Sequence, residues 1–179
     1  MEIIDAPRTN RITLRLPNSI VGELKKEANE KDIPLNALVT KFLNKDISYN
    51  RHVTALSHIT VPHMLFMKMI DIIDEHYIEK IASKGPAIVR KLFKKTGMSY
   101  DLDGILNHYL VVISKYCGWY ELTYENENNH YRLVFETNLG LKWTKFLSVY
   151  IGSILNSLDI NMIDSSADEN LIIFEFNKL

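Results

Sequence analysis

The sequence predicts an α+β chain in two parts, and three patterns lead to that prediction. Apolar and polar side chains alternate strictly over residues 11–16, which is the period of a half-buried β-strand. Two helical patterns with an apolar stripe follow this strand. After about residue 50, further helical patterns give way to pairs of short strands, which predicts helices packed on a mainly antiparallel sheet. We therefore expect a small domain at residues 1–50 and an α+β domain at residues 51–179.

The composition is that of an ordinary globular chain. Hydrophobic residues make up 46% and charged residues 24% of the 179 residues. No run approaches the roughly 20 apolar residues that a membrane span needs, and the acidic start is unlike a signal peptide. Cys117 is the only cysteine, so no intramolecular disulfide can form and a reducing cytoplasm is expected. Because the net charge is −1, any nucleic-acid contact has to come from a few placed cations.

The N-terminal domain is expected to contain one strand and two helices. The strand ends at Pro17, since proline has no N–H group for a ladder. Asn18 or Ser19 can cap the first helix. Asp32 is a candidate cap for the second helix, and Pro34 suits its first turn. The two apolar stripes consist of Ile20, Val21, Leu24 and Ala28, and of Leu35, Leu38, Val39, Phe42 and Leu43.

The larger domain is expected to run from helices into hairpins, with a turn signal between most elements. Gly97 ends a basic helix, and residues 125–129 have the composition of a hairpin loop. The expected elements are a short strand at residues 55–61, an apolar helix from Pro62 to Ile73, a basic helix with Arg90, Lys91, Lys94 and Lys95, a helix started by Asp101 or Asp103, strands at residues 118–124 and 130–136, a helix at residues 139–158, and strands at residues 160–163 and 171–176.

A six-residue amphipathic strand followed by two short helices is not stable as a single copy. The strand is unpaired on both edges, and the core is too small. Both problems disappear when two copies pair their strands antiparallel and interlock their helices. The paired ribbon has Ile12, Leu14 and Leu16 inside and Arg11, Thr13 and Arg15 outside. Such a ribbon fits the DNA major groove, and the N–H groups at residues 34–37 offer a seat for a phosphate.

These residues carry a resemblance to a known family. Residues 11–17, the helix after them and residues 33–39 resemble the ribbon-helix-helix family, the class of the Arc and methionine repressors. The resemblance covers about residues 9–48. It implies an obligate dimer that reads base edges of double-stranded DNA through Arg11, Thr13 and Arg15. It also implies phosphate contacts at the amino end of the second helix, here Leu35 and Asn36. In a further hypothesis, Arg8 also contacts the DNA. The structural alternative is that residues 11–16 form an ordinary edge strand whose arginines are merely solvated.

The larger domain is interpreted as a regulatory domain. Its order of elements, with residues 135–143, is similar to small-molecule sensing folds related to haem-nitric-oxide-binding and vinyl-reductase-type domains. Residues 130–146 also resemble uncharacterised archaeal regulators that have the same N-terminal module. The resemblance implies the same two-domain plan, with no established ligand. An effector site for an unknown small molecule and assembly beyond the dimer both stay open.

Metal sensing and enzymatic activity have little support in the sequence. A nickel or zinc site needs several convergent His or Cys side chains, and a haem needs an axial ligand, for which only His63 or His108 comes into question. The six histidines are scattered at His52, His58, His63, His76, His108 and His130. No glycine-rich phosphate loop or nucleophile motif occurs, and helix capping accounts for Asp101 and Asp103. We therefore expect no enzyme, no metal and no cofactor.

The sequence predicts a one-component transcriptional regulator, such as a repressor, that binds specific DNA as a homodimer. It is expected in the cytoplasm, associated with the nucleoid, and not in a membrane. Two alternatives stay open. One is an antitoxin-like or partner-binding protein that uses the same DNA module, and the other is an architectural chromatin protein.

Overall fold

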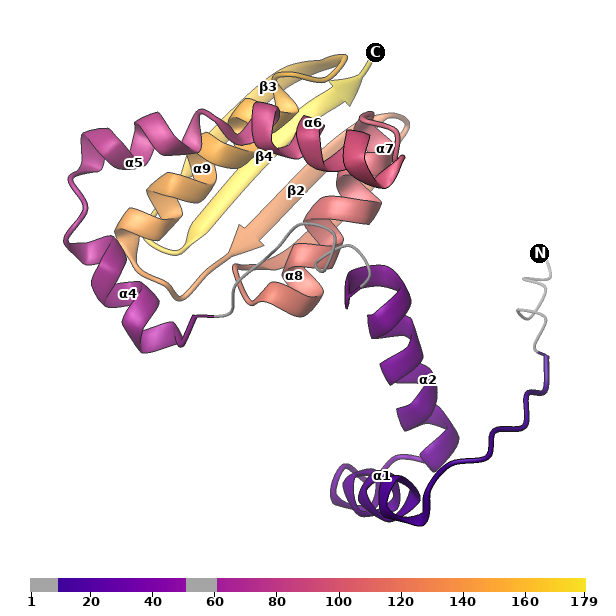
Figure 1. Cartoon of the computed structure of the whole chain (residues 1–179). Helices are drawn as coiled ribbons and strands as arrows, with labels where there is room; N and C mark the ends of the chain where they lie inside the picture. Colours follow the sequence, from indigo (N-terminus) through magenta and orange to yellow (C-terminus); the bar gives the residue numbers. More distant parts are fainter. Residues whose placement is uncertain (1–9, 51–60) are drawn as a thin grey trace. The chain divides into compact units, whose positions relative to one another are not determined.

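The structure, a computed structural model, describes residues 10–50 and 61–179 (Figure 1). It divides into two compact units, Met1–Asn44 and Lys45–Leu179. Residues 45–50 are counted with the larger unit, and the domain boundary expected near residue 50 stays a prediction. Of the strand expected at residues 55–61, all but Val61 lies outside the described residues.

The smaller unit contains two helices, α1 (Asn18–Glu30) and α2 (Leu35–Lys45), of which the last residue is counted with the larger unit. Pro17 occupies the N-cap position of α1, and no side chain caps this end. The capping role predicted for Asn18 or Ser19 is therefore wrong. Both residues lie inside the first turn, where the fixed φ of Pro17 (−55°) directs the chain into the helix.

Helix α1 ends at a residue with a left-handed backbone conformation, in the turn that leads to α2. Asp32 has a φ of 49°, and the N–H of Ile33 donates to Ala28 O at 3.0 Å. This is the long-range bond of a Schellman-type C-cap. Asp32 therefore closes α1, and it does not open α2 as the sequence suggested. The N–H of Leu38 donates to Pro34 O at 3.1 Å, so Pro34 directly precedes the first turn of α2.

Residues 10–17 form neither helix nor strand in the single chain (Figure 1). A β-strand exists only by pairing with another strand, and this segment has no partner among the residues that the structure describes. The intermolecular ribbon therefore stays a prediction.

In its described residues, the larger unit begins with seven helical segments. They are η1 (Asp46–Asn50), α4 (His63–Asp71), α5 (Glu75–Ala82), α6 (Gly85–Thr96), α7 (Leu102–Ile105), η2 (Leu106–Leu110) and α8 (Val111–Cys117). The apolar helix expected up to Ile73 is α4, but it ends at Asp71, and α5 was not expected as a separate helix. Asp74 separates the two, because its side chain accepts a hydrogen bond from His76 N at 2.9 Å and starts α5. Asp101 caps α7 through Gly104 N at 2.7 Å, as predicted.

Four strands form one antiparallel sheet in the order β1-β2-β4-β3. They are β1 (Glu121–Glu127), β2 (His130–Glu136), β3 (Ile160–Ala167) and β4 (Leu171–Lys178). The prediction of an α+β unit with an antiparallel sheet after helices is confirmed. Strand β2 has the predicted bounds, and β1 lies three residues later than the strand expected at residues 118–124. Strands β3 and β4 are longer than expected because the turn between them is tighter. Asn128 and Asn129, with φ of 52° and 68°, make the turn between β1 and β2, as hairpins with two-residue loops require.

The core lies between the sheet and α9 (Leu141–Leu155), which runs across the inner face of the sheet (Figure 1). Alternate residues of β2 and β4 point into this core, whereas the residues between them stay accessible on the outer face. The inner residues of the two strands are Tyr131, Leu133, Phe135, Ile172, Phe174 and Phe176. No helix in the described ranges is long and apolar enough to cross a membrane.

Candidate nucleic-acid interface

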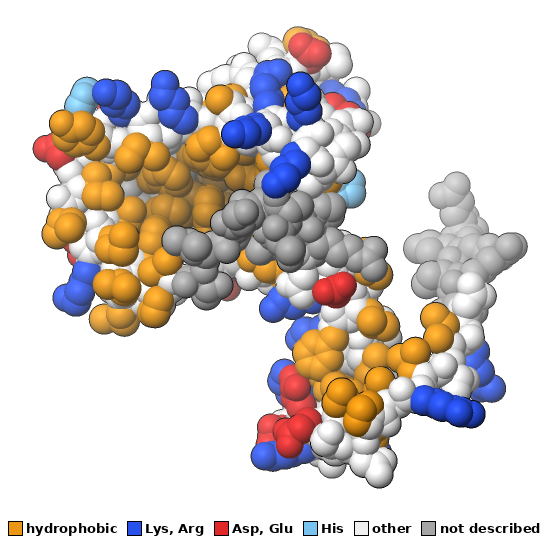
Figure 2. Space-filling model, in the orientation of Figure 1, with side chains coloured by type: hydrophobic (Ala, Val, Ile, Leu, Met, Phe, Trp, Pro, Cys, Tyr) orange, Lys and Arg blue, Asp and Glu red, His pale blue; other side chains and the backbone are white. Residues whose placement is uncertain are grey.

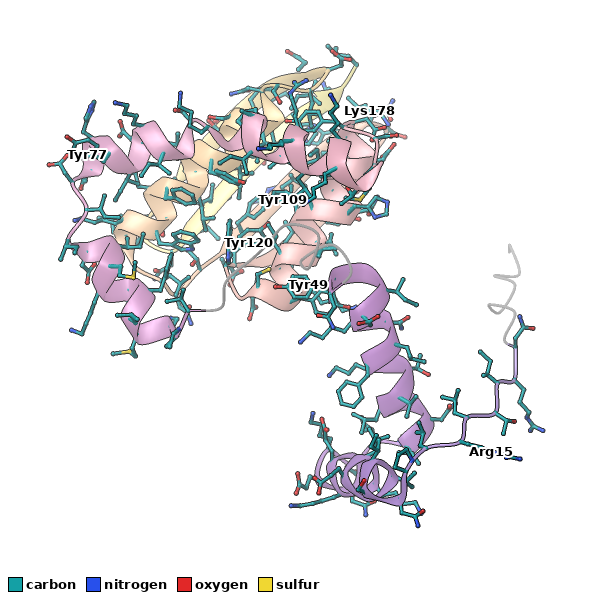
Figure 3. All side chains as sticks on the ribbon, in the orientation of Figure 1. Arg15, Tyr49, Tyr77, Tyr109, Tyr120 and Lys178 are labelled. Atoms are coloured by element: carbon teal, nitrogen blue, oxygen red, sulfur yellow. The ribbon has the colours of Figure 1, made fainter. Side chains whose placement is uncertain are left out.

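The segment that precedes α1 is exposed on both of its faces. Its polar residues Arg11, Thr13 and Arg15 are exposed, as the DNA hypothesis requires. Figure 3 shows Arg15 projecting from this segment. The apolar residues between them are exposed as well, with 77% of Ile12, 58% of Leu14 and 41% of Leu16 accessible. Exposure of three large aliphatic side chains to water is unfavourable. Their strict alternation therefore indicates that this segment packs against a partner that the described residues do not include.

The rest of the smaller unit shows the same incompleteness. Its buried apolar residues, among those described, are Ala28 from α1 and Leu38 from α2. The other large side chains of both stripes are half-buried or exposed, and the exposed ones are Ile20, Phe42 and Leu43. A core of this size does not offset the loss of chain entropy on folding. A second copy that covers these residues would complete it.

The predicted phosphate seat lies at the first turn of α2. Leu35 is half-buried and Asn36 is exposed. The first N–H bonded within this end of the helix is that of Leu38, so the N–H groups of residues 35–37 precede the intrahelical ladder. They point outward at the positive end of the helix dipole, which is the geometry that binds phosphate. In the predicted contact, the backbone rather than the Leu35 side chain would therefore hold the phosphate.

The net positive charge of the smaller unit comes from the exposed segment before α1. Residues 10–44 contain six Lys and Arg against four Asp and Glu. On α1, Glu27 and Lys31 form an ion pair one turn apart. No ion pair engages Arg11 or Arg15 among the described residues, so the two arginines are available to an external acceptor. Among the described residues of the single chain, no hydrogen bond or ion pair joins them to the first turn of α2.

Residues 5–46 match the model of a family described as the CopG antitoxin of type II toxin-antitoxin systems. The N-terminal segment is ribbon-helix-helix-like. The match spans α1, α2 and the exposed segment before them, and it ends where the larger unit begins. Comparisons of the chain with curated proteins and with solved structures give no match.

The histidines predicted to be scattered do not assemble a metal centre in the described ranges, where no group of three His, Cys, Asp or Glu residues is placed to hold an ion. Arg8, His52 and His58 lie outside the described residues. A depression of about 530 Å³ opens at one end of the sheet of the larger unit. It is lined by Ser114, Gly118, Trp119, Tyr120, Glu121, Glu136, Thr137, Asn138, Asn170 and Leu171.

The buried tyrosine hydroxyls of the larger unit form hydrogen bonds within its core. The hydroxyls of Tyr109 and Tyr150 lie 2.6 Å apart, and the Tyr120 hydroxyl donates to Leu110 O at 3.1 Å (Figure 3). Burial raises the pKa of Tyr109 and of Tyr120 well above the ordinary value, so both stay protonated. These hydroxyls are hydrogen-bonded inside the core, as buried polar groups usually are.

Proposed function

We propose that this chain is a sequence-specific DNA-binding transcriptional regulator that acts as a homodimer. The observation that carries the proposal is the exposed segment of residues 11–16, in which one face is apolar and the other holds two arginines and a threonine. Antiparallel pairing of two such segments buries Ile12, Leu14 and Leu16 in a shared core. The ribbon-helix-helix-like match over residues 5–46 supports this arrangement.

The same pairing accounts for DNA recognition. A two-stranded ribbon fits the major groove, where Arg11 and Arg15 can each contact guanine O6 and N7 bidentately. Thr13 can exchange a hydrogen bond with a base edge or contact a thymine methyl group. The N–H groups of Leu35 and Asn36 hold a backbone phosphate and thereby fix the register of the ribbon.

The test starts from genomic fragments that the purified full-length protein selects. On a selected fragment, we expect Arg11→Ala and Arg15→Ala each to weaken binding by about 1–3 kcal/mol, because a bidentate base contact is lost. Lys41→Ala, which removes an equal charge from an exposed position of α2, is the matched control and should change affinity much less. Fluorescence anisotropy measures both. Unchanged binding of both arginine variants would remove the groove-reading assignment.

Two outcomes separate the regulator from an architectural chromatin protein. A regulator binds its selected fragment far more tightly than random DNA of equal length, by about 10³-fold or more at physiological salt. An architectural protein binds both alike. The affinity for either DNA should fall with rising salt, because phosphate contacts release counterions. The salt response alone therefore does not discriminate, and the ratio of affinities does.

The family description favours an antitoxin as a second candidate. An antitoxin uses the same DNA module and neutralises a toxin with another part of its chain. Residues 45–179, however, form a compact unit with its own core, which is more than a short neutralising segment needs. Expression of the product of an adjacent reading frame, with and without this chain, decides between the two. Growth arrest that this chain relieves would establish the antitoxin role.

We also propose that the larger unit adjusts DNA binding, because a folded unit of this size is more than a DNA-binding module needs. The depression beside Trp119 has a volume within the range of small-molecule sites, roughly 300–1,000 Å³. Fragment selection repeated with a metabolite extract tests for an effector. An effector should change the affinity of the parent protein, and substitution of Glu136 in the lining should abolish that change.

A further inference from the structure

The larger unit has a broad apolar surface on its helical side. Figure 2 shows apolar side chains gathered in a hollowed patch over α4, α5 and α9. We define the helical apolar face as the large apolar residues of α4, α5, the connection between them and the start of α9 that are about half exposed or more. They are Met64, Leu65, Met69, Ile72, Tyr77, Ile81 and Leu141.

The helical apolar face is a rigid part of the unit. Lys142 Nζ of α9 donates to Asp71 O at 2.6 Å and to Ile73 O at 2.8 Å, which ties the end of α4 to α9. Lys145 of α9 forms ion pairs with Glu75 and Glu79 of α5 at 2.7 and 3.1 Å. The three helices thus present one continuous surface.

Packing beneath the face leaves its outer residues without a role in the core. The ring of Phe66 in α4 meets that of Trp143 in α9 edge to face, with 4.9 Å between the ring centroids. Trp143 in turn stacks on Phe146, with 4.7 Å between the centroids. Met67 and Ile70 also pack against the core. The inner side of α4 is therefore occupied by these residues, whereas Ile72 is 85% exposed and serves no internal contact of comparable size.

We propose that the helical apolar face is a second homodimer interface, where it packs against the same face of a second copy of this chain. The seven residues leave on the order of 700 Å² of apolar surface in water, close to the ~800 Å² that each partner contributes to a standard interface. The largest apolar patch of a typical monomer is about 300–600 Å². The area is therefore that of an interface, not of a chance patch.

Charge distinguishes this face from the other surfaces of the larger unit. Residues 63–82 and 141–149 contain four Lys and four Asp or Glu, so a second copy meets no net repulsion. Helix α6 has four Lys and Arg and no acidic residue. The four strands carry six Asp and Glu against one Lys and one Arg. Contact of either of these surfaces with its own copy would oppose like charges, which is unfavourable.

A dimer formed through the N-terminal segments keeps a second copy of the larger unit nearby. This step rests on the proposed function. Two chains that share a ribbon hold two larger units at a high effective concentration, in the millimolar range for short linkers. Because a two-fold dimer brings identical surfaces together, a self-complementary face closes within the same pair of chains.

The experiment uses the full chain and two sets of variants. Met69→Glu and Ile72→Glu each place a carboxylate on the face, and Ile163→Glu does the same at an exposed isoleucine of β3 outside it. Leu14→Glu disrupts the ribbon. Sedimentation velocity gives the dimer dissociation constant, and hydrogen exchange with mass spectrometry gives protection of residues 63–82.

We expect the Leu14→Glu protein to remain self-associating, with residues 63–82 protected as its concentration rises. Met69→Glu or Ile72→Glu added to it should raise its dissociation constant at least tenfold and abolish that protection, whereas Ile163→Glu should do neither. A Leu14→Glu protein that is monomeric at all concentrations, without protection of residues 63–82, overturns the second interface and leaves the ribbon in place. If Leu14→Glu binds operator DNA like the parent, the proposed function fails instead.

Discussion

The two units of this chain differ in whether one copy can complete a hydrophobic core. The larger unit buries residues from both of its hairpins and from five of its helices around α9. The smaller unit buries only Ala28 and Leu38 among its described residues, and it leaves Ile12 and Leu14 mostly in water. The larger unit thus completes its core within one chain, whereas the smaller unit does not do so with its described residues.

The same comparison explains where the chain can recognise DNA. A complete core leaves the outside of the larger unit to be shaped by other demands, such as the acidic outer face of the sheet, which repels phosphate. In the proposed dimer, the incomplete core of the smaller unit brings two copies together, and the pairing aligns Arg11 and Arg15 from both chains on one ribbon. Under this proposal, dimerisation and DNA recognition both follow from one alternating pattern.

The largest expected effect comes from the centre of the larger core. Phe135 is fully buried, with its ring centroid 4.9 Å from that of Tyr120 and 6.0 Å from that of Phe174. We expect Phe135→Ala to lower the free energy of unfolding of the larger unit by about 3–5 kcal/mol, since transfer energy is lost and a cavity remains. Tryptophan fluorescence in a urea titration measures it, because Trp119 and Trp143 are the only tryptophans and both lie in this unit.

The control for this prediction is Tyr124→Ala, which truncates an exposed aromatic residue of β1 and should cost far less. DNA binding by the Phe135→Ala protein sharpens the comparison. Because the smaller unit draws its core from a second chain, it should still bind its operator at urea concentrations that unfold the larger unit. Simultaneous loss of fluorescence and of DNA binding would contradict the separation of the two cores.

Much of the larger unit could be predicted from sequence, because its signals are local. Alternation over residues 130–136 and the loop composition of residues 125–129 located the first hairpin, although its turn is confined to Asn128 and Asn129. Asp101 marked a helix start. The break between α4 and α5 was missed, because the apolar pattern runs on through Ile73. Strand β3 was placed too short, since Ser165 and Ser166 have no apolar alternation and are held by pairing with β4.

The candidate site was harder to derive, because its geometry depends on a second chain. The positions of Arg11, Thr13 and Arg15 follow from alternation, and all three are exposed as expected. Their convergence on one ribbon face does not appear in a single copy. The helical apolar face was missed for a related reason. Its residues lie beside the core stripes of α4 and α5, and a sequence pattern does not show which apolar residues the core leaves uncovered.

A smaller effect is expected where the larger core contains polar groups. The hydroxyls of Tyr109 and Tyr150 are 2.6 Å apart and buried. Tyr150→Phe keeps the ring stacked near Phe146 but leaves the Tyr109 hydroxyl without this partner, which should cost about 1–3 kcal/mol of unfolding free energy. The double variant Tyr109→Phe/Tyr150→Phe should be less destabilised than the sum of the single variants, because no orphaned hydroxyl remains. Strict additivity in urea titrations would show that the pair is not coupled.

The smallest effect concerns the contact that fixes η1 to the larger unit. Tyr49 stacks on Tyr116 at 5.3 Å, and the Cys117 thiol lies 3.4 Å from its hydroxyl. Burial, and then the contact with Cys117, raises the pKa of Tyr49 to about 12. The folded protein thus keeps this proton above pH 10, where the unfolded chain releases it.

The contribution of Tyr49 to stability is therefore complete below about pH 10 and is lost as the pH rises toward 12. Burial also raises the pKa of Tyr109, Tyr120 and Tyr150, so Tyr49 is one of several late-titrating groups. Absorbance at 295 nm, which reports tyrosinate, should show one late-titrating group fewer in Tyr49→Phe than in the parent. Tyr124→Phe, which alters an exposed tyrosine, is the control and should leave the Tyr49 transition unchanged. A Tyr49 that ionises near pH 10 would mean that η1 is not held on α8, and residues 45–50 would then belong with the smaller unit.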